Sequence, residues 1–230
     1  MPSTGGHRQQ VVGCIGLGAM GLGMARQLLS AGYAVRGFDL DGDACAALAS
    51  SGGTVCASAA EAGEDCELLF IVVFTAAQAR DVLFGAGGAA DTLAPGATVC
   101  NHATTSPAQA VELATACAER GLLFLDSPVT GGKAGADAGT LTIISSGSAA
   151  ARSAAAAAYQ AMSGRVFHCG DSAGAASTVK MANQMLVGVH AVAAAEAVTL
   201  ARAGGAVRRS PKRWPLLRQQ VMRGSIAVST

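Results

Sequence analysis

The sequence predicts an α/β fold, in which a doubly wound and mostly parallel sheet is followed by one long helix. Three observations support this prediction. From residue 11 onward, short runs rich in Val, Ile, Leu and Phe alternate with Ala-rich stretches, which is the pattern of repeated strand–helix–strand units. A glycine-rich turn joins the first run to the first stretch. Residues 174–203 read as one continuous helix, about 45 Å long at 1.5 Å per residue.

The apolar runs are assigned as strands, because each is bounded by Gly, Pro, Ser or Asp and because strands buried in a parallel sheet are apolar nearly throughout. They lie near residues 11–16, 34–39, 53–56, 67–74, 97–100, 122–126, 140–145 and 165–168. Helices are expected between them, at 20–31, 42–51, 58–64, 76–83, 106–120 and 148–163. The helix at 106–120 has the clearest beginning, since Ser106 is a favourable N-cap and Pro107 suits the first helical position.

The first strand runs into a G-x-G-x-x-G motif at the start of a helix. Its residues are Gly16, Leu17, Gly18, Ala19, Met20 and Gly21. Gly16 permits a tight turn, Gly18 lets a pyrophosphate approach the backbone, and Gly21 lets the helix pack closely on the strand. The helix N-terminus adds free N–H groups and the positive end of a dipole. The motif therefore predicts a dinucleotide-binding domain of the Rossmann type, with these six residues at the cofactor.

An acidic residue stands where such a domain needs one. The second strand ends at Asp39, 18 residues after Gly21, and a carboxylate there can accept hydrogen bonds from an adenosine ribose. No basic residue follows it within 40–43, so the charge of a 2′-phosphate would meet only carboxylates. We therefore predict NAD as the cofactor and expect NADP to be disfavoured by Asp39. The alternative is a structural glycine turn that binds no nucleotide.

The long predicted helix marks the start of a second unit. Its middle, residues 181–195, has no formal charge and is apolar nearly all round, so we expect it to be buried between other elements. A second helical domain or a partner subunit would supply the cover. The expected organisation is a disordered lead at 1–10, a Rossmann domain at 11–172, the long helix at 173–205 and an aberrant basic tail at 206–230.

Composition narrows the class of protein. An apolar content of 51% excludes a disordered chain. The longest run of large apolar residues, 68–74, is far shorter than the roughly 20 residues of a membrane span, and the first ten residues lack the apolar segment of a secretory signal. These observations predict a cytoplasmic protein without a membrane partner.

Charge is divided unevenly along the chain. The net charge is +1, yet all 15 acidic residues precede residue 206, whereas six of the 16 basic residues follow residue 205. The basic tail has neither a fold pattern nor an aromatic platform for nucleic acid, so no nucleic-acid partner is expected. The seven cysteines form no C-x-x-C pair and are interpreted as free thiols, used as small buried hydrophobes. His102, His168 and His190 share no ligand spacing, and no metal site is predicted.

Four motifs in order give the chain a resemblance to the 3-hydroxyisobutyrate dehydrogenase family, short β-hydroxyacid dehydrogenases related to 6-phosphogluconate dehydrogenase. The resemblance covers residues 11 to about 205. The motifs are Gly16 to Gly21 continuing to Met24-Ala25, Thr104-Thr105-Ser106-Pro107, Asp126-Ser127-Pro128-Val129-Thr130-Gly131-Gly132, and Lys180-Met181-Ala182-Asn183-Gln184. They look like the glycine motif, the S-T-x-S-P segment near the nicotinamide, the D-A-P-V-S-G-G substrate loop and the catalytic K-x-x-N-[NQ] of that family. The last motif is most similar to the L-threonate dehydrogenase branch, with tartronate semialdehyde reductases close by.

The resemblance implies roles for individual residues. Lys180 would be the general acid/base that takes the hydroxyl proton as hydride leaves, unless it is an ordinary surface lysine. Thr130, Gly131 and Gly132 would hold the substrate carboxylate, and Asn183 would orient substrate or lysine, with a buried packing amide as the alternative.

Further cofactor contacts are implied for Phe74 and Thr104. The chain departs from the family where Thr130 and Ala103 replace serines.

The implied function is an NAD-dependent oxidoreductase that moves hydride between a small hydroxy acid, L-threonate-like or another 2- or 3-hydroxy acid, and the nicotinamide. Two alternatives stay open: a Rossmann module that binds NAD without turnover, and a tartronate semialdehyde reductase. The family continues into an all-α C-terminal domain, and we expect a homo-oligomer when that domain is complete. Because residues 206–230 lack helical periodicity, we expect that domain to be truncated here. Our hypothesis is that a shift of reading frame in the coding DNA produces this ending.

Overall fold

The computed structural model describes residues 9–205. Most of the lead predicted at 1–10 and all of the tail predicted at 206–230 lie outside the described residues. The chain divides into two compact units, one that ends at Thr178 and one that begins at Val179. Each unit is described by itself.

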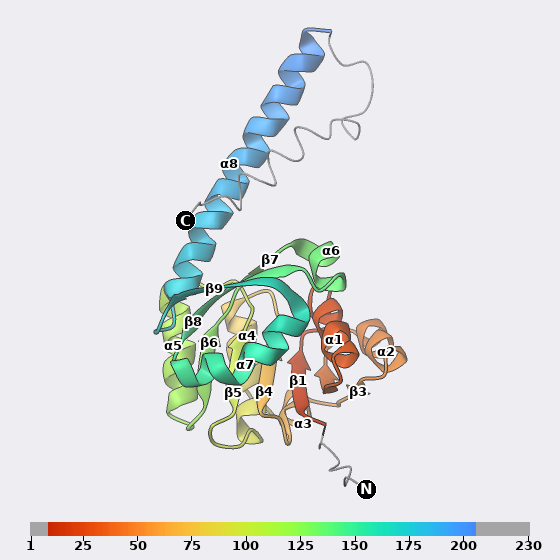
Figure 1. Cartoon of the computed structure of the whole chain (residues 1–230), viewed down its shortest axis with the longest axis vertical. Coiled ribbons are helices and arrows are strands. Elements are labelled where there is room, and N and C mark those ends of the chain that lie inside the picture. The colour runs from red at the N-terminus through yellow and green to blue at the C-terminus, as the bar shows by residue number, and fades with distance from the viewer. Residues whose placement is uncertain (1–8, 206–230) are drawn as a thin grey trace, which may run out of the picture. The chain divides into compact units, whose positions relative to one another are not determined.

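The first unit is built on a nine-stranded sheet, shown in Figure 1. The strands run in the order β3-β2-β1-β4-β5-β6-β8-β7, and β9 also pairs with β8. Their bounds are β1 (Val11–Ile15), β2 (Ala34–Phe38), β3 (Thr54–Val55), β4 (Leu68–Ile71), β5 (Thr98–Asn101), β6 (Leu123–Asp126), β7 (Val129–Thr130), β8 (Leu141–Gly147) and β9 (Ser163–Gly170). Strands β1 to β6 pair in parallel, whereas β8 is antiparallel to both β6 and β7. The predicted mostly parallel, doubly wound sheet is therefore confirmed.

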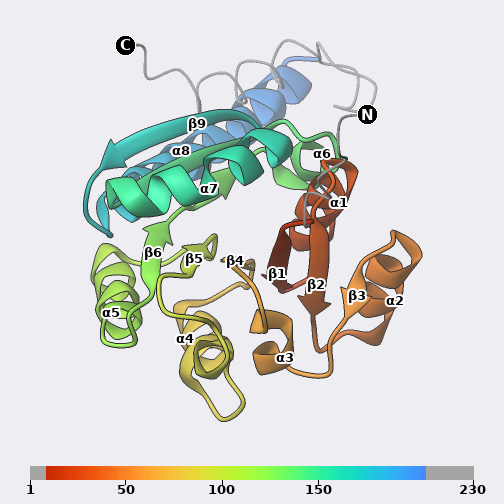
Figure 2. The ribbon, with the colours of Figure 1, turned by 60° about the horizontal axis from the view of Figure 1, so that its bottom comes forward.

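Helices cover both faces of this sheet. Their bounds are α1 (Gly21–Ser30), α2 (Gly42–Ser50), α3 (Ala59–Gly63), α4 (Ala76–Phe84), the 3₁₀ turn η1 (Ala89–Asp91), α5 (Pro107–Ala118), α6 (Gly132–Asp137) and α7 (Ala149–Met162). Buried side chains of α1, α2 and α7 share one apolar core, and those of α3, α4 and α5 share another on the opposite face. Figure 2 shows α1 and α7 on one side of the sheet and α3 to α5 on the other. Every helix predicted up to residue 163 occurs, while α6 and η1 were not predicted.

Some predicted boundaries are wrong for local reasons. The strand expected at 67–74 ends at Ile71, because the chain turns toward Thr75, the N-cap of α4, in a capping box with Gln78. Phe74 therefore lies in a loop. The strand expected at 165–168 extends over Ser163–Gly170, because its pairing with β8 continues past the apolar residues that marked it.

The cysteines behave as predicted from their apolar surroundings. All seven are free thiols, and five of them are buried. Burial raises the pKa of Cys66 and of Cys100 to about 12, so these thiols stay protonated and unreactive at neutral pH.

The predicted long helix is confirmed as α8 (Ala175–Ala203), a continuous helix of 29 residues that begins in the first unit and continues through the second. The expected burial of its middle is not seen within the described residues, where Met185 is 71% and Val192 is 60% exposed. By length and composition alone, with a mean hydropathy of 1.4, α8 could cross a membrane. Counting consecutive large apolar residues missed this, because alanines separate them.

Candidate cofactor and substrate site

The glycine turn has the geometry that its sequence predicts. Gly16 has φ +89°. This left-handed backbone conformation costs free energy for residues other than glycine. Its N–H donates to the carbonyl of Phe38 at 3.0 Å. This turn carries the chain from the carboxyl end of β1 into α1.

The other two motif glycines have different surroundings. A Cβ at Gly21 would overlap the carbonyl oxygen of Gly16, whereas a Cβ at Gly18 would meet no described atom within 4 Å. Gly21 is thus required for packing inside the protein. Gly18 leaves open space at the N-terminus of α1, where a ligand could approach the backbone. Met20, the N-cap residue, makes no side-chain cap hydrogen bond, so no cap from that residue competes for the first-turn amides.

Asp39 lies against the glycine turn although 22 residues separate it from Leu17. The N–H of Leu17 donates to Asp39 Oδ2 at 2.5 Å, and the N–H of Asp41 donates to Asp39 Oδ1 at 2.9 Å. A carboxylate offers about four lone-pair sites, so both oxygens can still accept from a ligand. The acid and the glycine turn therefore lie together and make up the candidate cofactor site.

This site lies where the strand order reverses. Strand β1 is flanked by β2 on one side and β4 on the other, and ligands of doubly wound sheets bind at the carboxyl ends of strands at such a point. Phe74, which follows β4, is 88% exposed, although its N–H donates to Gln78 Oε1 at 3.0 Å. The hydrogen bond fixes the backbone of Phe74, and its ring is exposed to a ligand.

The segment after β5 divides its polar side chains between surface and core. Thr104 is exposed, whereas Thr105 is buried with its hydroxyl 3.0 Å from that of Ser177. Ser106 caps α5 in a capping box with Gln109, as predicted. Ala103 is only 1% exposed, so the hydroxyl that the family usually has there would be buried.

The predicted carboxylate-binding turn joins β7 to α6. Gly131 has φ +130° and Gly132 has φ +64°, and both residues are exposed. These conformations favour glycine and leave the backbone open to a ligand. Lys133 pairs with Asp137 at 2.5 Å on the surface of α6, so its ammonium group is solvated.

Lys180 and Asn183 lie three residues apart on α8 and so on one face of that helix. The Lys180 side chain is buried, and burial lowers the pKa of its amine below the ordinary value. The Nδ2 of Asn183 is also buried and has no hydrogen-bond partner among residues 9–205. These two residues belong to the second unit, and the other site residues belong to the first.

Sequence reasoning missed a role for Asp126. This carboxylate is fully buried at the end of β6 and accepts hydrogen bonds from three groups at the start of α8. They are the N–H of Gly174 at 3.0 Å, the N–H of Ser177 at 2.9 Å and the Ser177 hydroxyl at 2.8 Å. The available signal was an acid directly after the apolar run 122–125, because a buried charge requires partners.

His102 is packed in the interior of the first unit. Its ring stacks on Phe70 at 5.9 Å between centroids, and Nδ1 lies 2.6 Å from the carbonyl of Ser127. Burial lowers the pKa of His102 to about 4, so the ring is neutral at pH 7.

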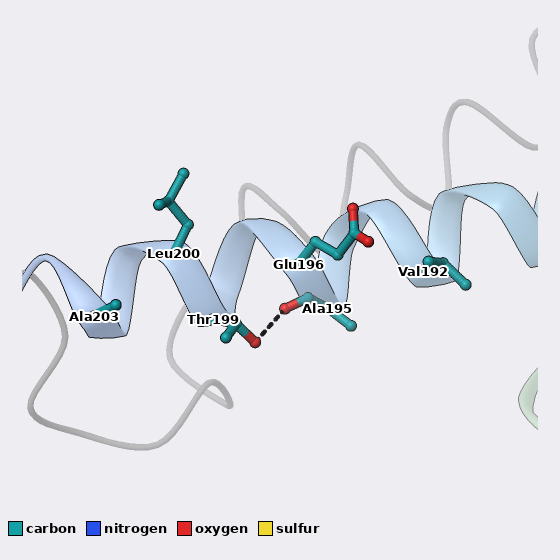
Figure 3. Close-up of a pocket in the computed structure, with 6 residues that line it drawn as sticks. All are labelled: Val192, Ala195, Glu196, Thr199, Leu200 and Ala203. Carbon is teal, nitrogen blue, oxygen red and sulfur yellow. Dashed lines mark hydrogen bonds between the residues drawn. The ribbon is translucent and has the colours of Figure 1, made fainter.

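A hollow along α8 contains none of the predicted site residues. Figure 3 shows its lining residues, Val192, Ala195, Glu196, Thr199, Leu200 and Ala203. The Thr199 hydroxyl donates to the carbonyl of Ala195 at 2.8 Å. Val192 lies 12 residues beyond Lys180, or about 18 Å along a helix. Glu196 is the only ionisable side chain among these lining residues, so the hollow lacks the combination of groups that an active site needs.

Comparison with known proteins gives a consistent result. Residues 11–170 match the model of the NAD binding domain of 6-phosphogluconate dehydrogenase. The chain is 47% identical to an L-threonate dehydrogenase of Cupriavidus necator over 189 residues, which are 82% of this chain and 64% of that protein. It is 42% identical to an L-threonate dehydrogenase of Escherichia coli K12 over 195 residues, covering 84% of this chain and 65% of that protein. The chain thus spans just under two thirds of the length of these curated relatives.

Solved structures extend the similarity to the long helix. A 3-hydroxyisobutyrate dehydrogenase from Salmonella typhimurium superposes with a TM-score of 0.82 at 39% identity, covering 94% of this chain and 80% of that one. A Mycobacterium tuberculosis 3-hydroxyisobutyrate dehydrogenase, solved with L-serine, has a TM-score of 0.80 at 31% identity and covers 87% of this chain and 68% of that one. A match over 94% of 230 residues cannot omit the 29 residues of α8. The helix is therefore part of the shared architecture.

Proposed function

The chain belongs to the 3-hydroxyisobutyrate dehydrogenase family and carries its NAD-binding domain, and from this premise we propose that it exchanges hydride between NAD and a small hydroxy acid. Relatives at 47% and 42% identity are named L-threonate dehydrogenases. We therefore propose L-threonate or a similar hydroxy acid as substrate.

One observation carries the cofactor part of this proposal. The Asp39 carboxylate is hydrogen-bonded to the N–H of Leu17 in the glycine turn, and the next glycine, Gly18, leaves the backbone unobstructed. A pyrophosphate placed over Gly18 would lie beside the acid that accepts from the adenosine ribose. Asp39 would repel the 2′-phosphate of NADP, which supports a preference for NAD.

Lys180 supports the proton-transfer part. NAD, when bound, supplies the hydride acceptor. The reacting alcohol must then give up its hydroxyl proton, and a neutral amine is a suitable acceptor for it. Burial lowers the pKa of Lys180, which increases the fraction of neutral amine near physiological pH. In the reverse direction the ammonium form would return the proton to the carbonyl oxygen.

The substrate carboxylate would be held by two kinds of donor. Thr130 offers a hydroxyl, and the open backbone of Gly131 and Gly132 offers N–H groups. The buried, unpartnered Nδ2 of Asn183 would gain an acceptor when a substrate oxygen binds, since a buried donor without a partner costs free energy. Thr104 and Phe74 would contact the cofactor.

A second candidate function is an NAD-binding module without turnover. The observation that favours it is that the matching family model describes an NAD-binding domain alone, over residues 11–170. The two candidates share every expectation about NAD and differ only in hydride transfer.

The experiment combines binding with turnover. Purified protein is titrated with NAD and then assayed for NAD reduction with L-threonate. We expect binding and turnover in the parent chain, and a 10²- to 10⁴-fold loss of turnover with unchanged NAD affinity in Lys180→Ala. Lys133→Ala is the matched control, because Lys133 is exposed and salt-bridged. Binding without turnover would support the second candidate, and absence of binding would contradict both.

We also propose a cytoplasmic homo-oligomer. The exposed apolar side chains of α8 would be covered by protein, since the helix is shared with 3-hydroxyisobutyrate dehydrogenase structures. Size-exclusion chromatography without detergent tests this, and a well-behaved monomer would contradict it.

A further inference from the structure

The beginning of α8 is attached to the sheet by buried polar contacts. Asp126, at the end of β6, accepts from Gly174 N–H, Ser177 N–H and the Ser177 hydroxyl at 2.8 to 3.0 Å. Ser146, on β8, accepts from the N–H of Ala176 at 3.0 Å. The Thr105 hydroxyl lies 3.0 Å from that of Ser177. Residues 174–177 are therefore held by three separate parts of the first unit.

These contacts satisfy groups that a helix otherwise leaves open. The first four N–H groups of a helix have no partner within it, and its N-terminus carries partial positive charge that favours an anion. Asp126 and Ser146 supply acceptors for three such N–H groups. Because Asp126 and Ser177 are almost fully buried, water cannot easily replace these acceptors.

We propose that Asp126 is a positioning residue, which fixes the first turn of α8 and through it the location of Lys180. Lys180 follows Ser177 by three residues, less than one helical turn and about 4.5 Å along the axis. Residues at i and i+3 share a helix face. Loss of the Asp126 contacts would let the first turn fray as far as Lys180. The functional significance of this inference rests on the proposed role of Lys180.

The direction of the Lys180 pKa supports this inference. The pKa is lowered by burial, so it depends on the amine being kept from water. A frayed first turn would admit water and raise the pKa toward the ordinary lysine value of about 10.4. The pKa of the Lys180 amine therefore reports whether the first turn of α8 is fixed.

Two measurements on the full 230-residue chain test the inference without cofactor or substrate. Amide hydrogen exchange reports on Gly174 and Ser177. The pH dependence of acetylation by trace acetic anhydride reports on Lys180, with exposed Lys133 in the same molecule as internal standard. The variants are Asp126→Asn and Ser177→Ala. Asp171→Asn is the control. Asp171 lies three residues before Gly174 in the chain, but it pairs with Arg152 on the surface at 2.7 Å.

In Asp126→Asn we expect exchange at both amides to accelerate about 10- to 100-fold, the range for hydrogen bonds to a charged group. The Lys180 pKa should rise, because a frayed first turn would let water reach the amine. Ser177→Ala keeps the charge and should give the same changes to a smaller extent. It also provides the test if Asp126→Asn does not fold.

The inference is overturned if both variants leave amide exchange as in the parent chain. It is equally overturned if exchange accelerates and the Lys180 pKa does not rise. Failure of the proposed function has a different signature, since a parent chain that does not bind NAD would leave these readouts unchanged.

Discussion

The N–H of Leu17 donates a 2.5 Å hydrogen bond to the carboxylate of Asp39. This bond connects the turn after β1 to the end of β2. It places a negative charge beside the open backbone at Gly18, where we propose that the adenosine ribose binds.

The first prediction concerns cofactor choice. In Asp39→Asn, NAD affinity should fall by about 10- to 100-fold, because hydrogen bonds to a carboxylate contribute about 1.5–3 kcal/mol. Discrimination against NADP should fall as well, because the repelling charge is gone. Calorimetric titration with each dinucleotide measures both effects.

Asp41→Asn is the matched control for this prediction. Asp41 is the N-cap of α2 and accepts from Asp43 N–H, and Asn is as good an N-cap as Asp. Its variant should keep the parent's stability and its preference for NAD. Equal loss of preference in the two variants would mean that charge in general, and not Asp39, selects the cofactor.

The second prediction separates the motif glycines. Gly18→Ala should keep stability within about 1 kcal/mol, because its added methyl meets no described atom within 4 Å and its φ is not positive. NAD affinity should nevertheless fall at least about tenfold, or 1.4 kcal/mol, as the methyl occupies the approach to the backbone. Unchanged affinity would remove Gly18 from the site.

Gly21→Ala should reduce stability, which Gly18→Ala should keep. Its methyl overlaps the carbonyl of Gly16, so urea unfolding should show a loss of about 1–3 kcal/mol. A stable Gly21→Ala variant would contradict the assigned packing role.

Phe74 provides a third prediction. Because its ring is 88% exposed, Phe74→Ala should leave the melting temperature nearly unchanged. If the ring packs on the cofactor, NAD affinity should fall by about 0.5–1.5 kcal/mol. Val111→Ala, at a half-exposed position on α5, is the control that should change neither quantity. A Phe74→Ala variant with parental affinity would exclude the contact.

The fourth prediction is a pH dependence of stability from His102. Burial lowers the pKa of His102 from the ordinary histidine value of about 6.5 to about 4, so the unfolded chain binds its proton first as pH falls. The free energy of unfolding should therefore decrease between about pH 6.5 and pH 4, by about 3 kcal/mol at most from this residue. Urea unfolding at several pH values should show a smaller decrease in His102→Phe.

Identical slopes in the parent and His102→Phe would show that the buried ring does not titrate as expected.

The sequence predicts the parts of this protein that depend on local pattern. Apolar periodicity placed the strands of the parallel sheet, and the glycine spacing placed Gly16, Gly18 and Gly21 correctly at one turn. The Leu17–Asp39 contact followed from motif spacing, since consecutive parallel strands β1 and β2 bring their carboxyl ends together.

Other features depend on distant partners and were not predictable. Asp126 meets Gly174 and Ser177 about 50 residues later, and its place after the apolar run 122–125 does not indicate which residues it meets. The short elements β7 and α6 lack enough residues for a periodic signal. The exposure of α8 was missed because an apolar sequence indicates the need for cover and not where the cover comes from.

Titration of NAD into the purified parent chain and into Gly18→Ala tests the central claim most directly. We predict saturable binding to the parent with a dissociation constant below about 1 mM, the upper end of ordinary enzyme affinities, and at least tenfold weaker binding to a variant that melts at the parental temperature. No saturable NAD binding by a folded parent chain would contradict the account.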